Sequence, residues 1–366
     1  MSKEDIYGKA GVDYAKIDPL KRFAQTKALT TSNNLLHFGI SEVKASRGES
    51  AYVWEENDCH RAFVIEGLGT KNLVADELRE VTGKTYYDSL AIDTVAMITN
   101  DLIVVGAQPL VVNAYFAVGS SEWFADEKRT EDLVNGWVEA CNEICASYGG
   151  GESPVLNGVI KENTIDLAGS AIGIIKPKER LTLGDKLEKG DRILLVESSG
   201  IHSNGLSLAR KIAGRLPKGY ETSLSDETMY GALLTPTHLY AKLTKSLFDA
   251  GIDIHYMVNI TGHGWRKLMR AKEEFSYIID RVPEPHTVFN FIQETENITD
   301  EEMYGNFNMG AGFAVFLPEK DIKKAIEVAK VNKLKAINAG YVNKGERQVI
   351  IKPKNIVFSS NTLSVR

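Results

Sequence analysis

The clearest pattern of apolar positions lies between residues 130 and 148. Apolar side chains recur there at the three- and four-residue spacing of one helix face: Leu133, Val134, Trp137, Val138, Cys141, Ile144, Cys145 and Tyr148. Thr130 can cap the start of this helix and Gly149 can end it. The sequence therefore predicts a core helix over 130–148, in which both cysteines pack against apolar neighbours.

Short apolar runs bounded by glycine or polar residues predict the strands. They lie at Ala62–Ile65, Leu110–Gly119, Thr164–Ile175, Asp191–Glu197, Ile254–Val258, 313–317, 336–343 and 347–351. Further helices are predicted at about Asn72–Val81, Asp88–Val105, 206–215, Thr235–Gly251, Thr299–Phe307 and 319–332. Strands and helices mix without strict alternation, which favours an α+β fold over a doubly wound sheet.

The length of 366 residues predicts two domains. The charged, turn-rich segment Lys176–Lys189 is a plausible boundary, so we expect domains at 1–178 and 179–352 and a tail at 353–366. A net charge of −6 argues against nucleic acid or an anionic membrane as partner. The N-terminus has no signal-peptide core, and three cysteines without a disulfide pattern favour a cytoplasmic location.

The segment Glu66–Lys71 is a candidate phosphate site. Gly67 and Gly69 follow an apolar strand, and Thr70 and Lys71 open a predicted helix. Free amides at a helix start, together with an ammonium group, suit a phosphate. The spacing is not that of a Walker loop, and an ordinary strand–turn–helix joint with a surface lysine remains the alternative.

The predicted helix Asp88–Val105 carries acids. Asp93 and Asn100 share one face, and Asp101 lies beside it. Because burial of unpaired carboxylates is costly, these acids either face water or meet a cation such as magnesium.

A second loop of small residues, Ser198–Gly205, precedes another helix and suits an anion. His202 within it either neutralises a phosphate, transfers a proton or is an ordinary loop residue. The segment Gly149–Pro154 is predicted to be a flexible loop with Glu152 at its tip.

Taken in chain order, these segments resemble phosphoribosylformylglycinamidine cyclo-ligases. The resemblance rests on Tyr7–Asp13, Glu66–Lys71, Asp93–Pro109, Gly150–Glu152, Asp166–Gly169, Ser198–Gly205, Leu234–Thr237, Ile260–Gly262, Met303–Tyr304 and Phe307–Asn308. It implies a homodimer in which N-terminal strands of two subunits form a β-barrel. It also implies ATP, Mg²⁺ and a ribonucleotide substrate whose imidazole ring is closed after phosphorylation of a formyl oxygen.

The resemblance also assigns roles to residues. ATP would contact Gly67, Gly69, Thr70, Lys71, Asn100, Gly150, Gly151 and Glu152, with Asp166 nearby. The magnesium ligands would be Glu66, Asp93 and Asp101. Substrate would contact Ser199, Gly200, His202, Ser203 and Asn204, and the catalytic residues would be Lys71, Asp101 and His202.

Several positions depart from the family pattern. Glu66 replaces an aspartate, Gln108 a glutamate and His263 a glycine, Ser153–Val155 lacks a second acid, and the first glycine-rich stretch is reduced to His37–Gly39. Other ATP-using members of the superfamily therefore remain alternatives, namely thiamine-monophosphate kinase, selenophosphate synthetase and the hydrogenase-maturation dehydratase. A non-catalytic nucleotide-binding subunit is the alternative from a different class.

Overall fold

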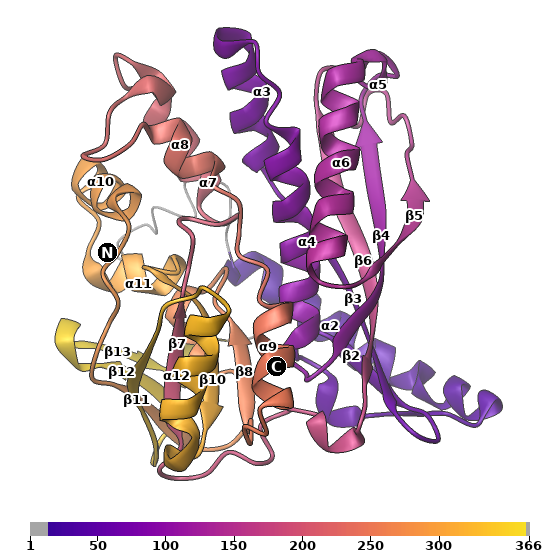
Figure 1. Cartoon of the computed structure of the whole chain (residues 1–366), viewed down its shortest axis with the longest axis vertical. Coiled ribbons are helices and arrows are strands. Elements are labelled where there is room, and N and C mark those ends of the chain that lie inside the picture. The colour runs from indigo at the N-terminus through magenta and orange to yellow at the C-terminus, as the bar shows by residue number, and fades with distance from the viewer. Residues whose placement is uncertain (1–13, 364–366) are drawn as a thin grey trace.

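The computed structural model describes residues 14–363 and contains two sheets flanked by helices (Figure 1). The six-stranded sheet has the order β1-β2-β3-β6-β4-β5 and the seven-stranded sheet the order β13-β12-β9-β11-β7-β10-β8. Each sheet comes from one half of the chain, so the predicted α+β class is confirmed. The predicted N-terminal arm Tyr7–Asp13 lies outside the described residues.

The first sheet is open and is covered on one face by helices. Its strands are β1 (Ser41–Glu42), β2 (Tyr52–Glu55), β3 (His60–Gly67), β4 (Gln108–Val118), β5 (Ser147–Glu152) and β6 (Ile165–Ile175). The helices of this half are α3 (Lys71–Thr82), α4 (Tyr87–Ile103), α5 (Glu122–Ala125) and α6 (Glu127–Glu143). Helix α4 packs between the sheet and α6, and it is apolar on nearly all sides, as expected of a buried helix.

The other face of the first sheet is not covered by residues 14–363. Along β3, Ala62 and Val64 are buried, whereas Phe63 is 42% and Ile65 is 70% exposed. The strand predicted at Ala62–Ile65 is therefore confirmed, but its apolar residues are not all buried, because β3 alternates between a core face and an open apolar face.

The second sheet contains β7 (Arg192–Glu197), β8 (Tyr256–Asn259), β9 (Phe275–Ile279), β10 (Ala311–Leu317), β11 (Ala336–Lys344), β12 (Gln348–Ile351) and β13 (Ile356–Ser359). Around it lie α7 (Leu206–Ala213), α8 (Met229–Leu234), α9 (Ala241–Asp249), α10 (Thr287–Glu296), α11 (Asp300–Asn306), α12 (Ile322–Val331) and the 3₁₀ helix η5 (Gly264–Met269). Because β13 pairs with β12, part of the segment expected to be a tail belongs to the sheet.

Two predicted helix boundaries were wrong. Helix α6 ends at Glu143, the backbone turns at Cys145 with φ of 58°, and the predicted loop 149–154 begins instead in β5, which pairs with β4. Asp126, not Thr130, caps α6 by accepting a hydrogen bond from the amide of Arg129. Cys141 is buried as expected, whereas Cys145 is exposed.

The second boundary concerns α9, which begins at Ala241 instead of Thr235. Residues 235–240 form an irregular segment, and α8, just before it, was not predicted.

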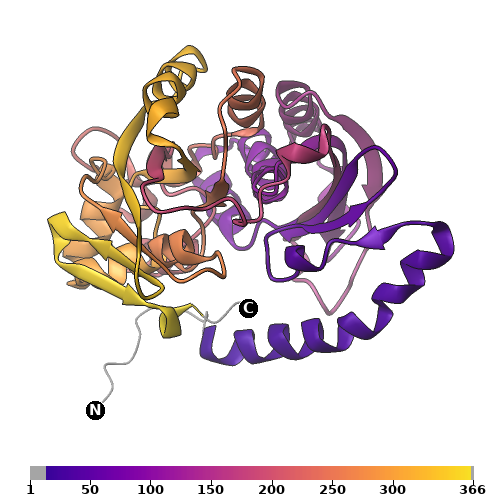
Figure 2. The same cartoon turned by 90° about the horizontal axis from the view of Figure 1, so that it is seen from below.

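Helix α2 (Tyr14–Ala28) and the 3₁₀ helix η1 (Leu29–Phe38) form an arm along the underside of the molecule (Figure 2). Its outer side exposes Leu20 and Phe23, while Asp18 on its inner side is buried. Among residues 14–363, no helix has the length and apolar character needed to cross a membrane.

We predict that Gly136→Ala destabilises the first half of the chain. A Cβ at this position in α6 would overlap the backbone of Asp88 and approach its Cα to 2.7 Å. Separating the helices should cost about 1–3 kcal/mol in the free energy of unfolding, in spite of the better helix propensity of alanine. Denaturant titration measures this. Gly214→Ala is the control, because its Cβ would have no neighbour closer than 3.6 Å. Equal effects of the two substitutions would contradict the prediction.

Candidate functional site

A cavity of about 490 Å³ lies between the two halves of the chain and beneath helix α2. It brings together residues that are far apart in sequence, from α2, β3, α4 and η5. The polar and charged residues that line it are Lys21, Gln25, Glu49, Ser50, Glu66, Asp101, Asn204, Thr261, His263, Lys267 and Arg270. Three of the predicted site residues, Glu66, Asp101 and Asn204, line this one cavity.

Secondary structure explains how the charges reach this cavity. Glu66 lies near the end of β3 and Asp101 in the last turn of α4. Lys267 and Arg270 come from η5 and its end, three residues apart. A 3₁₀ helix has three residues per turn, so these two side chains project from the same side. Sequence analysis did not predict either residue as part of the site. The signal it could have used is that both basic residues follow the Ile260–Gly262 motif by a few positions.

Two of the carboxylates in the cavity, those of Glu66 and Asp101, lie close enough to affect each other. Burial, followed by the neighbouring Asp101, raises the pKa of Glu66 to about 7. Asp101 accepts a hydrogen bond of 2.6 Å from the Asn259 amide. Because the ionised form of Glu66 is disfavoured here, a divalent cation between Glu66 and Asp101 would stabilise it. The donor set thus fits Mg²⁺, which prefers carboxylate oxygens.

The positive side of the cavity is equally well defined. Burial lowers the pKa of Lys267, whose ammonium donates to Thr261 Oγ1. The Arg270 guanidinium donates to the Gly48 carbonyl at 2.9 and 3.1 Å and to Ser50 Oγ at 2.9 Å. Burial lowers the pKa of His263 to about 4, so its imidazole is neutral at pH 7. Carboxylates facing fixed cations in one cavity suit a metal-bound polyphosphate.

Asp93 does not join this cavity. It lies eight residues before Asp101 in α4, which places the two Cα atoms about 12 Å apart along the helix axis. Glu66, Asp93 and Asp101 also form no metal-ligand cluster among the described residues. The geometry therefore separates Asp93 from the other two predicted magnesium ligands.

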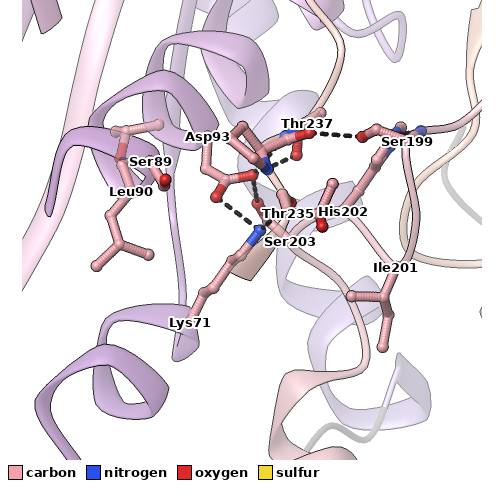
Figure 3. Close-up of polar contacts among 12 residues, drawn as sticks. Lys71, Ser89, Leu90, Asp93, Ser199, Ile201, His202, Ser203, Thr235 and Thr237 are labelled. Carbon is pink, nitrogen blue, oxygen red and sulfur yellow. Dashed lines mark hydrogen bonds and ion pairs between the residues drawn. The ribbon is translucent and has the colours of Figure 1, made fainter. Parts of the chain in front are cut away.

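Asp93 instead forms a buried ion pair with Lys71 (Figure 3). Lys71 Nζ lies 2.6 Å from Asp93 Oδ2, and both side chains are 0% exposed. Lys71 also donates to the Thr235 carbonyl at 2.9 Å. Burial lowers the pKa of Lys71, and the Asp93 carboxylate opposes that change. The side chain of Lys71, which was predicted to bind phosphate, therefore points into the protein interior.

The other oxygen of Asp93 accepts three further hydrogen bonds. They come from the Thr237 amide at 2.9 Å, from Thr237 Oγ1 at 2.5 Å and from Ser203 Oγ at 3.3 Å (Figure 3). Asn100, one turn before the end of α4, likewise binds the segment before α9, through the His238 carbonyl and the Tyr240 amide. Asn100 is 1% exposed and does not line the cavity.

The glycine turn itself remains accessible. Gly67 and Gly69 are exposed, and Gly69 has φ of 76°, a conformation that favours glycine. Thr70 Oγ1 lies 3.2 Å from Ser207 Oγ in the second half of the chain. The turn therefore lies accessible beside Glu66 without the ammonium group that was predicted, and within it the Leu68 amide donates to the Leu167 carbonyl at 2.8 Å.

The predicted substrate loop is divided between the ion pair and the cavity. Asn204 faces the cavity, whereas Ser203 binds Asp93. Burial, then His238, lowers the pKa of His202 well below its usual value. Nε2 of His202 accepts a hydrogen bond of 3.1 Å from the Ser199 amide, so this histidine is neutral and shapes the loop. Ser199 Oγ donates to the Pro236 carbonyl, and Gly200 is buried.

The remaining predicted site residues lie elsewhere in this subunit. Gly150, Gly151 and Glu152 belong to β5, an exposed edge strand separated from β3 by two strands. Asp166 is exposed on β6, on the face of the sheet opposite to Glu66, because side chains alternate along paired strands.

We predict strong energetic coupling between Lys71 and Asp93. Lys71→Met should cost about 3–5 kcal/mol in the free energy of unfolding, because it leaves a buried carboxylate unpaired. The double variant Lys71→Met/Asp93→Asn should lose less than the sum of the two single losses, by about 1–3 kcal/mol. Denaturant titration of the four proteins tests this. Lys128→Met, from the exposed pair with Asp132, should leave stability unchanged. Additive losses would exclude the coupling.

Comparisons with known proteins cover both halves of the chain. Family models described as AIR synthase related protein match residues 48–175 with the N-terminal domain and residues 188–352 with the C-terminal domain. A phosphoribosylformylglycinamidine cyclo-ligase of Methanocaldococcus jannaschii is 37% identical over 331 residues, 88% of this chain and 88% of the relative. One of Carboxydothermus hydrogenoformans is 34% identical over 361 residues, 95% and 99% of the two chains.

A solved structure supports the fold at lower identity. The hydrogenase maturation protein HypE in complex with ATP has a TM-score of 0.57 and 19% identity, covering 76% of this chain and 81% of that chain. That likeness shows the fold alone. The family models and the identity with the two relatives show more, namely that this chain belongs to the phosphoribosylformylglycinamidine cyclo-ligase family.

Proposed function

We propose that this protein catalyses the ATP-dependent cyclisation of formylglycinamidine ribonucleotide to aminoimidazole ribonucleotide. The observation that carries the proposal is the cavity in which Glu66 and Asp101 face Lys267 and Arg270. Relatives named for this activity match along 88% and 95% of the chain. The reaction forms a C–N bond, so the protein acts as a ligase in purine biosynthesis.

ATP and the substrate supply every atom and electron that the reaction needs. The γ-phosphoryl group of ATP passes to the formyl oxygen, an amidine nitrogen attacks the activated carbon and loses a proton, and phosphate leaves with that oxygen. Most of the catalysis of such a transfer is positioning and stabilisation of charge. Here Lys267, Arg270 and Lys21 would neutralise phosphate oxygens, and the amides after Gly69, at the start of α3, would orient them.

Glu66 and Asp101 would hold Mg²⁺, which supplies charge neutralisation to the transferred phosphoryl group when it is bound. The substrate would contact the Ser199–Asn204 loop, of which Asn204 already reaches the cavity. Lys71, Asp93 and His202 would act by holding that loop and the segment before α9 in place.

We further propose that two subunits pair through the first sheets and close a β-barrel. The open sheet and its exposed apolar face, with Phe63, Ile65 and Leu110, support this arrangement. We place the domain boundary between 178 and 179, in the segment that connects the two sheets. A cytoplasmic location is supported by the three thiols, none of which forms a disulfide in the described chain.

The decisive measurement is an assay of the purified protein with ATP, Mg²⁺ and formylglycinamidine ribonucleotide. We expect aminoimidazole ribonucleotide and ADP in equal amounts. Asp101→Asn should lower kcat by at least about 100-fold, because it weakens the hold on the Mg²⁺ that would neutralise the transferred phosphoryl group. Glu122→Gln, on the exposed helix α5, is the control and should retain full activity. ATP binding without product would instead indicate a non-catalytic nucleotide-binding subunit.

The proposed dimer makes a separate prediction. The double substitution Phe63→Lys/Ile65→Lys should weaken self-association by at least about 100-fold, because it would bury charges in an apolar interface. Sedimentation velocity over a range of protein concentrations measures this. Val357→Lys serves as the control, since Val357 is 54% exposed on the second sheet. A wild-type protein that is monomeric at every concentration would exclude the dimer.

A further inference from the structure

A second group of possible metal ligands lies outside the cavity. Glu188, Asp191 and His255 each place a ligand atom within 4.8 Å of the other two. His255 Nδ1 lies 2.7 Å from Asp191 Oδ2, and the Glu188 amide donates to the same oxygen at 2.9 Å. Asp191 is 1% exposed and His255 is 6% exposed, whereas Glu188 is exposed.

The hydrogen bonds of Asp191 leave one of its oxygens without a partner. Among the described residues, no donor reaches Asp191 Oδ1, although this atom is buried. A buried carboxylate oxygen without a hydrogen bond is costly. A cation bound beside Asp191 would satisfy this oxygen.

The surrounding charge also favours a cation. Asp253 Oδ2 lies 3.4 Å from the other ring nitrogen of His255, so three carboxylates surround one imidazole. Lys186, 3.8 Å from Asp253, offsets part of this negative charge. The excess of negative charge is what a divalent ion would offset.

We propose that Glu188, Asp191 and His255 bind a divalent transition-metal ion, with zinc as the best match. One imidazole nitrogen and two carboxylates are borderline ligands that suit zinc better than magnesium. Because Glu188 lies at the surface, water can reach the ion and act as its fourth ligand.

The position of this site indicates a structural role. Asp191 directly precedes β7 and His255 directly precedes β8, and both strands run antiparallel to β10, which lies between them. An ion would therefore link the starts of two strands about 9–10 Å apart. The opposite end of β7 leads into the Ser198–Gly205 loop, and that of β8 leads to Thr261. The six residues of β7 place its two ends about 20 Å apart. The inference does not depend on the proposed reaction.

Isothermal titration of the chelator-treated full chain with ZnCl₂ tests the proposal. We expect one equivalent bound with a micromolar or lower Kd and a rise in Tm of at least about 3 °C at saturation. Glu188→Gln and His255→Gln should each weaken this binding at least tenfold. Because Glu188 is exposed, Glu188→Gln should fold normally, which circular dichroism without metal verifies.

Two control variants separate this site from other zinc ligands. Asp101→Asn should keep the binding event, because Asp101 belongs to the cavity, and His37→Gln should keep it, because His37 is an exposed histidine outside both sites. Visible absorption of bound Co²⁺ should disappear in His255→Gln and persist in both controls. Unchanged zinc affinity in Glu188→Gln and His255→Gln, or an equal loss in either control, would overturn the proposal.

Discussion

The buried ion pair between Lys71 and Asp93 determines how the two halves of the chain meet. Lys71 begins α3 and Asp93 lies in α4, both in the first half, whereas their other partners come from the second half: Ser203, Thr235 and Thr237. Charges withdrawn from water are tolerated only when they are paired and their remaining hydrogen bonds are satisfied. All these groups must be in place together, so one cluster positions two helices and two loops relative to one another.

This constraint divides α4 into a structural and a chemical part. Asp93 is held by Lys71, Ser203 and Thr237, and Asn100 by the segment before α9, so of these three polar residues Asp101 is the one that lines the cavity. The Ser199–Asn204 loop divides in the same way, with Ser203 on the ion pair and Asn204 on the cavity. Neighbouring residues thus have different tasks, and the rigidity of the ion pair determines where the cavity residues lie.

Most elements could be predicted from the sequence, because β6, β7 and β10 have strand composition and α3, α4 and α7 have a helical pattern. The two wrong helix boundaries have different causes. Ile144 and Tyr148 are apolar whether they continue α6 or lead into β5, so periodicity could not locate the helix end. Thr235 and Pro236 resemble a helix start, but Lys71 requires the Thr235 carbonyl and Asp93 the Thr237 amide. Long-range partners outweighed local preference there.

The site was harder to predict than the fold, because residue type does not reveal orientation. Helix α4 is apolar on nearly every side, so no polar face indicated that Asp93 and Asp101 point to different partners. Lys267 and Arg270 were missed for a geometric reason. With about 100° per residue in an α-helix, side chains three apart diverge by about 60°, whereas in a 3₁₀ helix they coincide. The 3₁₀ form of η5, held at its end by Arg270 on Gly48 and Ser50, therefore creates the positive side of the cavity.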